Sequence, residues 1–157
     1  MSHVRYTNIV GKVIDHPDER QIRHDLSEVP WRQWYRCLQG AAMLEVVSDE
    51  NDPHSVRPGK TSPQPVLIVA QPNADEFLLS WLEDRREWVP WNGGTCEAFS
   101  TYFSGGNEHR IPDACLVDSE TALRVMLHFV TQQTRDNSVT WTRLDELPVE
   151  ADFWEPM

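Results

Sequence analysis

The sequence predicts an α+β fold, with an antiparallel sheet of about five or six strands, an N-terminal helix or helices, and one helix before the last strand. Two observations support this prediction. Short apolar or alternating segments, separated by Pro, Gly, Asn and Asp, recur through the middle of the chain, as strands of antiparallel sheets do. A later segment has its apolar residues at helical spacing. The length of 157 residues fits one domain spanning 1–157.

The N-terminal part is expected to form a strand and then a helix. Residues 4–14 contain a strand-like segment that is broken by Gly11. Asp15 or His16 can cap the helix that follows, with Pro17 in its first turn. Apolar residues then recur on one face of this helix at Ile22, Leu26 and Val29. Aromatic residues over 31–40 have helical spacing again and predict a second helix that ends at Gly40.

The middle of the chain predicts a run of strands. Segments 41–47, 66–70 and 76–82 are strand-like, and the last two are joined by a turn over 72–75, which predicts a hairpin. Residues 49–65 form a long Pro-rich loop. Further strands are expected at 97–103, 116–117 and 139–144. The chain ends in an acidic tail over 145–157.

The helix before the last strand has the clearest signals. Asp118 is a good N-cap and Glu120 lies in the first turn, where a carboxylate favours the helix dipole. The helix is expected to run over about 119–132. Its core-facing stripe consists of Ala122, Val125, Met126, Phe129 and Val130.

Charge excludes several classes of partner. The net charge of −11, from 25 acids against 14 bases, argues against binding nucleic acid or an anionic membrane, because both require a basic surface. It favours a basic protein partner, although acidity also serves solubility alone. The N-terminus has no long apolar run that predicts a signal peptide, and no stretch is long enough to cross a membrane. The sequence therefore predicts a cytoplasmic protein.

No motif in the chain predicts catalysis. The histidines form no HExxH pair, and Cys37, Cys96 and Cys115 are too scattered to predict a disulfide framework or a zinc site. Gly105-Gly106 lacks the Lys and helix of a phosphate-binding loop. We therefore expect no catalytic residue, metal ligand or cofactor, and a protein that is not an enzyme.

The last third of the chain resembles a known family. Its order is a Gly93-Gly94 turn, an aromatic strand, a Gly105-Gly106 turn, a short apolar strand, the capped helix, and a last strand that contains Trp141. This order, over residues 65–144, resembles the first-described immunity-protein family of bacterial polymorphic toxin systems. The resemblance implies a protein that binds and neutralises a cognate toxin, a nucleic-acid deaminase first and a nuclease second, by occluding its active site or substrate groove. The turn at 134–137 departs from the family because it lacks the usual Gly and Pro.

Candidate partner-binding residues cluster around the first Gly-Gly turn. Trp is frequent in this chain, at 7 of 157 residues, and it is enriched both in cores and at interface anchors. The candidate set combines aromatic and acidic residues near turns: Trp88, Trp91, Asn92, Glu97, Glu108 and Asp113. A competing interpretation places both Trp residues in the core. The alternative function is a small enzyme or ligand-binding domain with an aromatic pocket near Trp88 and Trp91.

Overall fold

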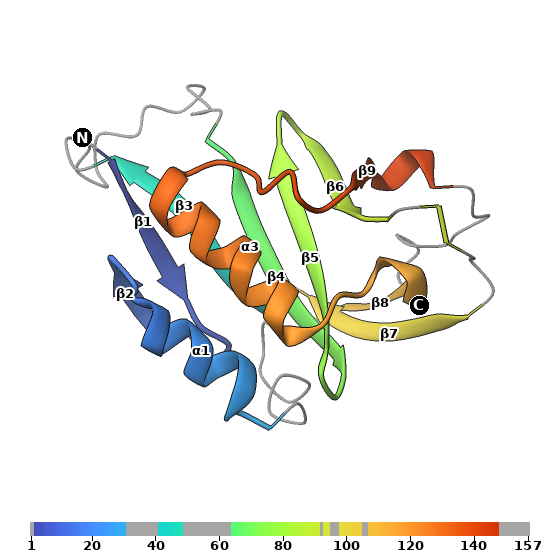
Figure 1. The fold of residues 1–157 in the computed structure, drawn as a ribbon, viewed down its shortest axis with the longest axis horizontal. Coiled ribbons are helices and arrows are strands. Elements are labelled where there is room, and N and C mark those ends of the chain that lie inside the picture. Colours follow the sequence, from blue (N-terminus) through green and yellow to red (C-terminus); the bar gives the residue numbers. More distant parts are fainter. Residues whose placement is uncertain are drawn as a thin grey trace.

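The computed structural model describes residues 2–30, 41–48, 64–91, 93–94, 98–104 and 107–147. Within these ranges the fold is α+β, as predicted, with two helices placed on one face of a large antiparallel sheet (Figure 1). The sheet is larger than expected. Seven strands form it in the order β2-β1-β3-β4-β5-β6-β9, and β7 pairs with β8 in a separate hairpin.

The strands of the large sheet are β1 (Ser2–Thr7), β2 (Val13–Asp15), β3 (Ala41–Ser48), β4 (Val66–Asn73), β5 (Glu76–Glu83), β6 (Arg86–Pro90) and β9 (Trp141–Arg143). The hairpin consists of β7 (Phe99–Ser104) and β8 (Asn107–Pro112). The prediction was correct for β3, β4 and β5 within a few residues. It missed β6 and β8. Only Val117 of the expected strand at 116–117 pairs, through an isolated bridge to Phe77.

Helix α1 (Glu19–Ser27) begins later than expected. Asp18 is its N-cap, not Asp15 or His16, and Pro17 precedes the helix. The Asp18 carboxylate accepts a hydrogen bond from the Gln21 backbone, and the Gln21 side chain accepts one from the Asp18 backbone, each 2.9 Å long. This reciprocal capping box satisfies two backbone donors that the first turn otherwise leaves unpaired. The two hydrogen bonds explain why the helix begins after Asp18 and is not capped by Asp15 or His16. The helix predicted over 31–40 lies outside the described residues.

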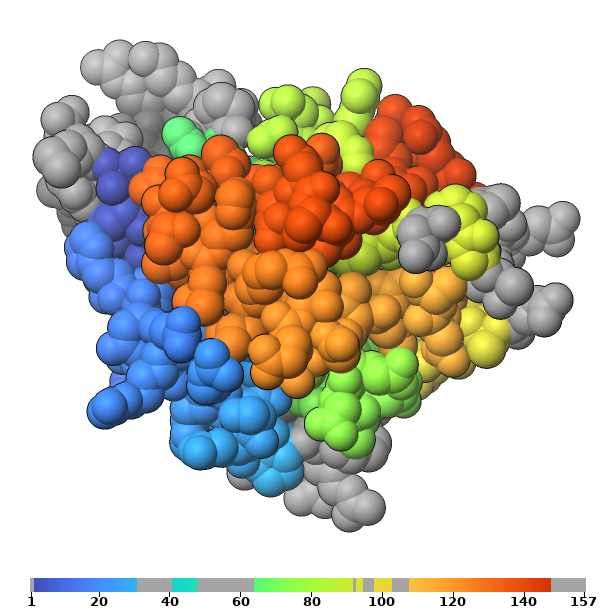
Figure 2. All heavy atoms as spheres, viewed as in Figure 1, coloured from blue at the N-terminus to red at the C-terminus, as the bar shows by residue number. Residues whose placement is uncertain are grey.

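Helix α3 (Ser119–Gln132) matches its prediction. The Asp118 side chain accepts a 2.8 Å hydrogen bond from the Thr121 backbone, as an N-cap should. The predicted stripe faces the sheet, and Ala122, Met126 and Phe129 are fully buried there. Figure 2 shows α3 and the segment that follows it covering the middle of this face, with α1 beside them. We call this the helical face of the sheet.

The core has two parts because side chains alternate along each strand. On the helical face, Tyr6, Leu44, Leu67, Leu79 and Trp81 pack against the two helices. On the opposite face, Ala70, Leu78 and Val89 contact the β7–β8 hairpin and the short 3-10 helices η2 (Asp113–Cys115) and η3 (Leu144–Glu146). The 49–65 loop lies outside the described residues except for its last two, and the acidic tail is described only to residue 147.

Candidate partner-binding surface

Trp88 belongs to an aromatic layer on the helical face. It lies opposite Trp81 on β5 and Arg143 on β9. Its ring is half-buried, and the Arg135 guanidinium lies 5.5 Å from its centroid and 5.8 Å from that of Trp141. A cation above two aromatic faces contributes stability and shields the rings from solvent. This environment favours a structural role for Trp88.

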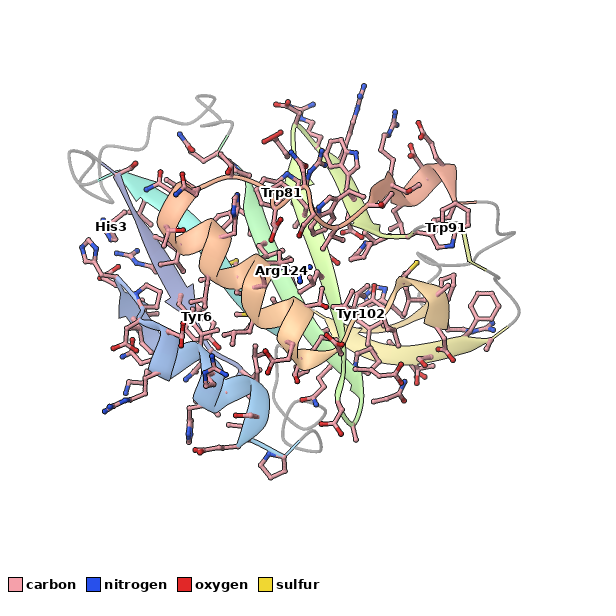
Figure 3. All side chains as sticks on the ribbon, viewed as in Figure 1. His3, Tyr6, Trp81, Trp91, Tyr102 and Arg124 are labelled. Carbon is pink, nitrogen blue, oxygen red and sulfur yellow. The ribbon has the colours of Figure 1, made fainter. Side chains whose placement is uncertain are left out.

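Trp91 lies on the other side of the sheet. It follows β6, and its half-buried ring packs against the core cluster that contains Val89. Its backbone N–H donates a 2.9 Å hydrogen bond to the carbonyl of Thr140. The indole Nε1 is buried and has no hydrogen-bond partner, which is unusual for a buried Trp. Figure 3 shows Trp91 far from Tyr6, at the opposite end of the sheet.

The two Trp rings therefore do not line one pocket. Residues three apart in an extended strand point to opposite faces, and the structure places Trp88 with the helices and Trp91 with the opposite core. The 460 Å³ cavity beside α1 is lined by residues of the N-terminal segment and by neither Trp. Asn92 and Glu97, the candidates between the Trp pair and β7, lie outside the described residues.

Asp113 is held in a hydrogen-bond network at one end of the sheet. The Asn73 amide donates a 2.8 Å hydrogen bond to the Ser100 hydroxyl, which in turn donates to the Asp113 carboxylate. The same amide is 3.3 Å from a carboxylate oxygen of Glu76. The backbone of Asp113 also bonds to Ala98. These contacts tie the β4–β5 turn to the β7–β8 hairpin.

Carboxylates gather around this network. Phe77 and Val117 exchange two backbone hydrogen bonds, of 2.8 and 2.9 Å, which hold the β4–β5 turn beside the start of α3. The residues gathered here form what we call the acidic end: Asp75, Glu76, Asp113, Asp118 and Glu120. Within the described residues, none of the five forms an ion pair. The hydrogen bond from Thr121 lowers the pKa of Asp118, so that this capping carboxylate stays ionised.

Glu108 is separate from the acidic end. It lies opposite Phe103, near the turn that joins β7 to β8, whereas Asp113 follows the other end of β8. The two residues are five positions apart along the chain, or about 17 Å at roughly 3.4 Å per residue. Of the four candidate residues that the structure describes, Asp113 alone therefore lies at the acidic end.

Sequence reasoning missed Glu87. It lies opposite Leu82 on the face away from the helices, where its side chain is half-buried. Burial raises the pKa of its carboxyl to about 7, and no described cation forms an ion pair with it. Burial, together with the charge of Glu87, also raises the pKa of Tyr102 on β7. No sequence signal could have identified Glu87, because its burial depends on how the β7–β8 hairpin covers this face.

The described residues contain no cluster of three or more His, Cys, Asp or Glu side chains placed to hold a metal ion. In the same part of the chain, neither helix has the length and apolarity needed to span a bilayer. Compared with models of known protein families and with curated proteins, the sequence gave no match.

Proposed function

We propose that this chain is an immunity protein. It binds a cognate bacterial toxin domain in the cytoplasm and blocks the toxin's active site or substrate groove. The proposed toxin class is a nucleic-acid deaminase, and a nuclease is the second candidate. The proposal rests on the resemblance of residues 65–144 to an immunity-protein family and on the charge of the chain.

The acidic end is the structural feature that supports this proposal best. A toxin that acts on nucleic acid has a basic substrate groove, because it must attract a phosphate backbone. Asp75, Glu76 and Glu120 present carboxylates that no described cation neutralises. The Asn73–Ser100–Asp113 network fixes the turn that carries two of them. A fixed array of negative charges is complementary to such a groove, and complementarity of this kind raises the association rate most.

The alternative function has less support. An enzyme or ligand-binding domain with an aromatic pocket would need Trp88 and Trp91 on one side of a cavity. The two rings instead pack against different core clusters on opposite faces of the sheet. The described residues therefore support a toxin-binding protein better than an enzyme with an active site near Trp88 and Trp91.

The experiment compares two double variants at opposite ends of β5. Asp75→Asn/Glu76→Gln removes two charges from the β4–β5 turn, and Glu83→Gln/Asp84→Asn removes two from the β5–β6 turn. Asp75 and Asp84 both have positive φ, 62° and 52°, which Asn tolerates, so the two variants are closely matched. Calorimetric titration with the toxin domain encoded beside this gene gives the affinities.

We expect the first double variant to bind the toxin domain roughly tenfold or more weakly, and the second to bind like the parent protein. Equal affinities for the parent protein and both double variants would show that the acidic end is not part of the interface. Failure of the parent protein to bind that toxin domain would refute the proposed function itself.

A further inference from the structure

The loop between β1 and β2 is closed by hydrogen bonds and leaves an apolar side chain in solvent. The Asn8 side chain accepts hydrogen bonds from the backbones of Val10 and Lys12, at 3.1 and 2.9 Å. Two backbone bonds close the same loop, and Gly11 supplies its positive φ of 84°. Val10 is nevertheless 68% exposed, and Val13 just beyond it is 54% exposed. Among the described residues these are the exposed large hydrophobic side chains.

This loop and helix α1 form most of the lining of a partly open cavity of about 460 Å³. Its size lies within the range of about 300–1,000 Å³ that is typical of small-molecule sites. The lining combines aliphatic walls with a few polar groups. It consists of Asn8, Ile9, Val10, Lys12, Ile14, Arg20, Gln21, His24, Asp25 and Val29.

Two cations, Lys12 and Arg20, line this cavity. Four described arginines do form ion pairs with carboxylates: Arg5 with Asp15, Arg23 with Glu19, Arg124 with Asp136, and Arg143 with Asp145 and Glu146. Lys12 and Arg20 form no ion pair with any described residue. His24 is held by Glu28 through an i,i+4 contact. Two free positive charges beside an apolar wall favour a ligand with an anionic group.

Asp25 provides an acceptor that faces the same cavity. It is only 8% exposed, and its Oδ2 accepts a 2.6 Å hydrogen bond from the buried hydroxyl of Tyr6. No described residue donates a hydrogen bond to its Oδ1. Because Asp25 lines the cavity, a ligand hydroxyl or amine can donate a hydrogen bond to this oxygen.

We propose that this cavity binds a small amphipathic anion. Its apolar body contacts Ile9, Ile14 and Val29, its anionic group reaches Lys12 and Arg20, and a hydroxyl or amine donates to Asp25. The site goes beyond the proposed toxin binding, because it uses the N-terminal segment and a ligand of opposite charge to the toxin groove.

The test is a titration of the ¹⁵N-labelled protein with 5-hydroxyindole-3-acetate, followed by amide NMR shifts. This probe carries a carboxylate, an aromatic body and a hydroxyl. We expect saturable shifts at the amides of residues 8–12 and 20–25. Lys12→Gln/Arg20→Gln should weaken binding roughly tenfold or more, because it removes both cations. Arg85→Gln/Arg86→Gln removes two cations from the β5–β6 turn and should leave binding unchanged.

Indole-3-acetate, which lacks the hydroxyl, tests the role of Asp25. It should bind more weakly than the hydroxylated probe by roughly threefold or more, because it cannot donate the hydrogen bond to Asp25. Shifts confined to other parts of the protein, or equal weakening by the two charge variants, would overturn the proposed site. Equal affinity for the two probes would overturn the role of Asp25. The amide spectrum of each variant shows directly that it is folded, and no measurement here involves a toxin.

Discussion

The Tyr6 hydroxyl donates a 2.6 Å hydrogen bond to the Asp25 carboxylate and thereby joins β1 to α1 inside the core. Tyr6 is fully buried and Asp25 nearly so. Burial and then the hydrogen bond to Asp25 raise the pKa of the Tyr6 phenol, so it remains a donor at every ordinary pH. The contact is short, buried and charge-assisted, which makes it one of the stronger hydrogen bonds in the fold.

Tyr6→Phe should lower the free energy of unfolding by about 1–3 kcal/mol, because it leaves the Asp25 carboxylate buried without that donor. Urea denaturation measures the change. Tyr102→Phe is the matched control, since Tyr102 is also buried but its hydroxyl makes no hydrogen bond to a described residue. Equal effects of the two substitutions would show that the Tyr6–Asp25 bond adds no stability.

Glu87→Gln should stabilise the protein at neutral to alkaline pH. The carboxyl has a pKa of about 7 in the folded protein and an ordinary value of 4.5. Below pH 4.5 it is protonated in both states and has no ionisation cost. As pH rises from 4.5 to 7, the unfolded chain ionises first, so this group's contribution to stability is lost. Above pH 7 the full cost of a buried charge remains.

The stability gain from Glu87→Gln should therefore grow from near zero at pH 4.5 to roughly 1–3 kcal/mol at pH 8. Chemical denaturation across this pH range is the measurement. Glu83→Gln, which removes a charge from the same hairpin, controls for net charge. A gain that stays constant with pH would mean that the Glu87 carboxylate is well solvated.

Phe129→Ala should destabilise the fold by about 3–5 kcal/mol, because the ring is fully buried and its removal leaves a cavity. The ring contacts Trp81 edge-on, with centroids 5.5 Å apart. Leu127→Ala, on the half-buried side of the same helix, should cost less. Thermal melts measure both changes. A Phe129→Ala protein that melts like the parent but no longer binds toxin would make this face an interface instead of core.

Association with a basic toxin should slow as the salt concentration rises, because salt screens the electrostatic attraction between the acidic end and the toxin. The Debye length falls from about 30 Å at 0.01 M salt to about 10 Å at 0.1 M. Stopped-flow mixing at several salt concentrations gives the rates. An association rate that does not change over this range would show that the net charge of −11 does not steer the toxin to this protein and serves solubility alone.

The elements that sequence reasoning located are those with local signals. Helix α3 has a capping Asp118 and a buried stripe, and β4 and β5 flank a turn, so each could be predicted from neighbouring residues. Strands β6 and β8 were missed because Arg86–Pro90 and Asn107–Pro112 contain charged residues and Pro, which disfavour strands. Their pairing partners β5, β9 and β7 determine them instead.

The candidate site was harder to predict for the same reason. Trp88 and Trp91 are only three positions apart in sequence, but they pack against core clusters on opposite faces of the sheet. Asp113 was selected as an acidic residue near a turn, and the structure places it in a hydrogen-bond network with Ser100 and Asn73. Its companions Asp75 and Glu76 come from a distant hairpin that the Phe77–Val117 bridge brings alongside. Such proximity depends on tertiary contacts, which no spacing in the sequence encodes.

A titration of toxin activity against this protein tests the proposed function most directly. The cognate toxin domain is held at a fixed concentration well above the dissociation constant, and its activity on nucleic acid is measured as the protein is added. Stoichiometric binding predicts a linear loss of activity that reaches zero at one equivalent. Complete inhibition by far less than one equivalent would show that the protein acts as an enzyme on the toxin or its substrate. Full toxin activity at several equivalents would show that the protein does not neutralise this toxin.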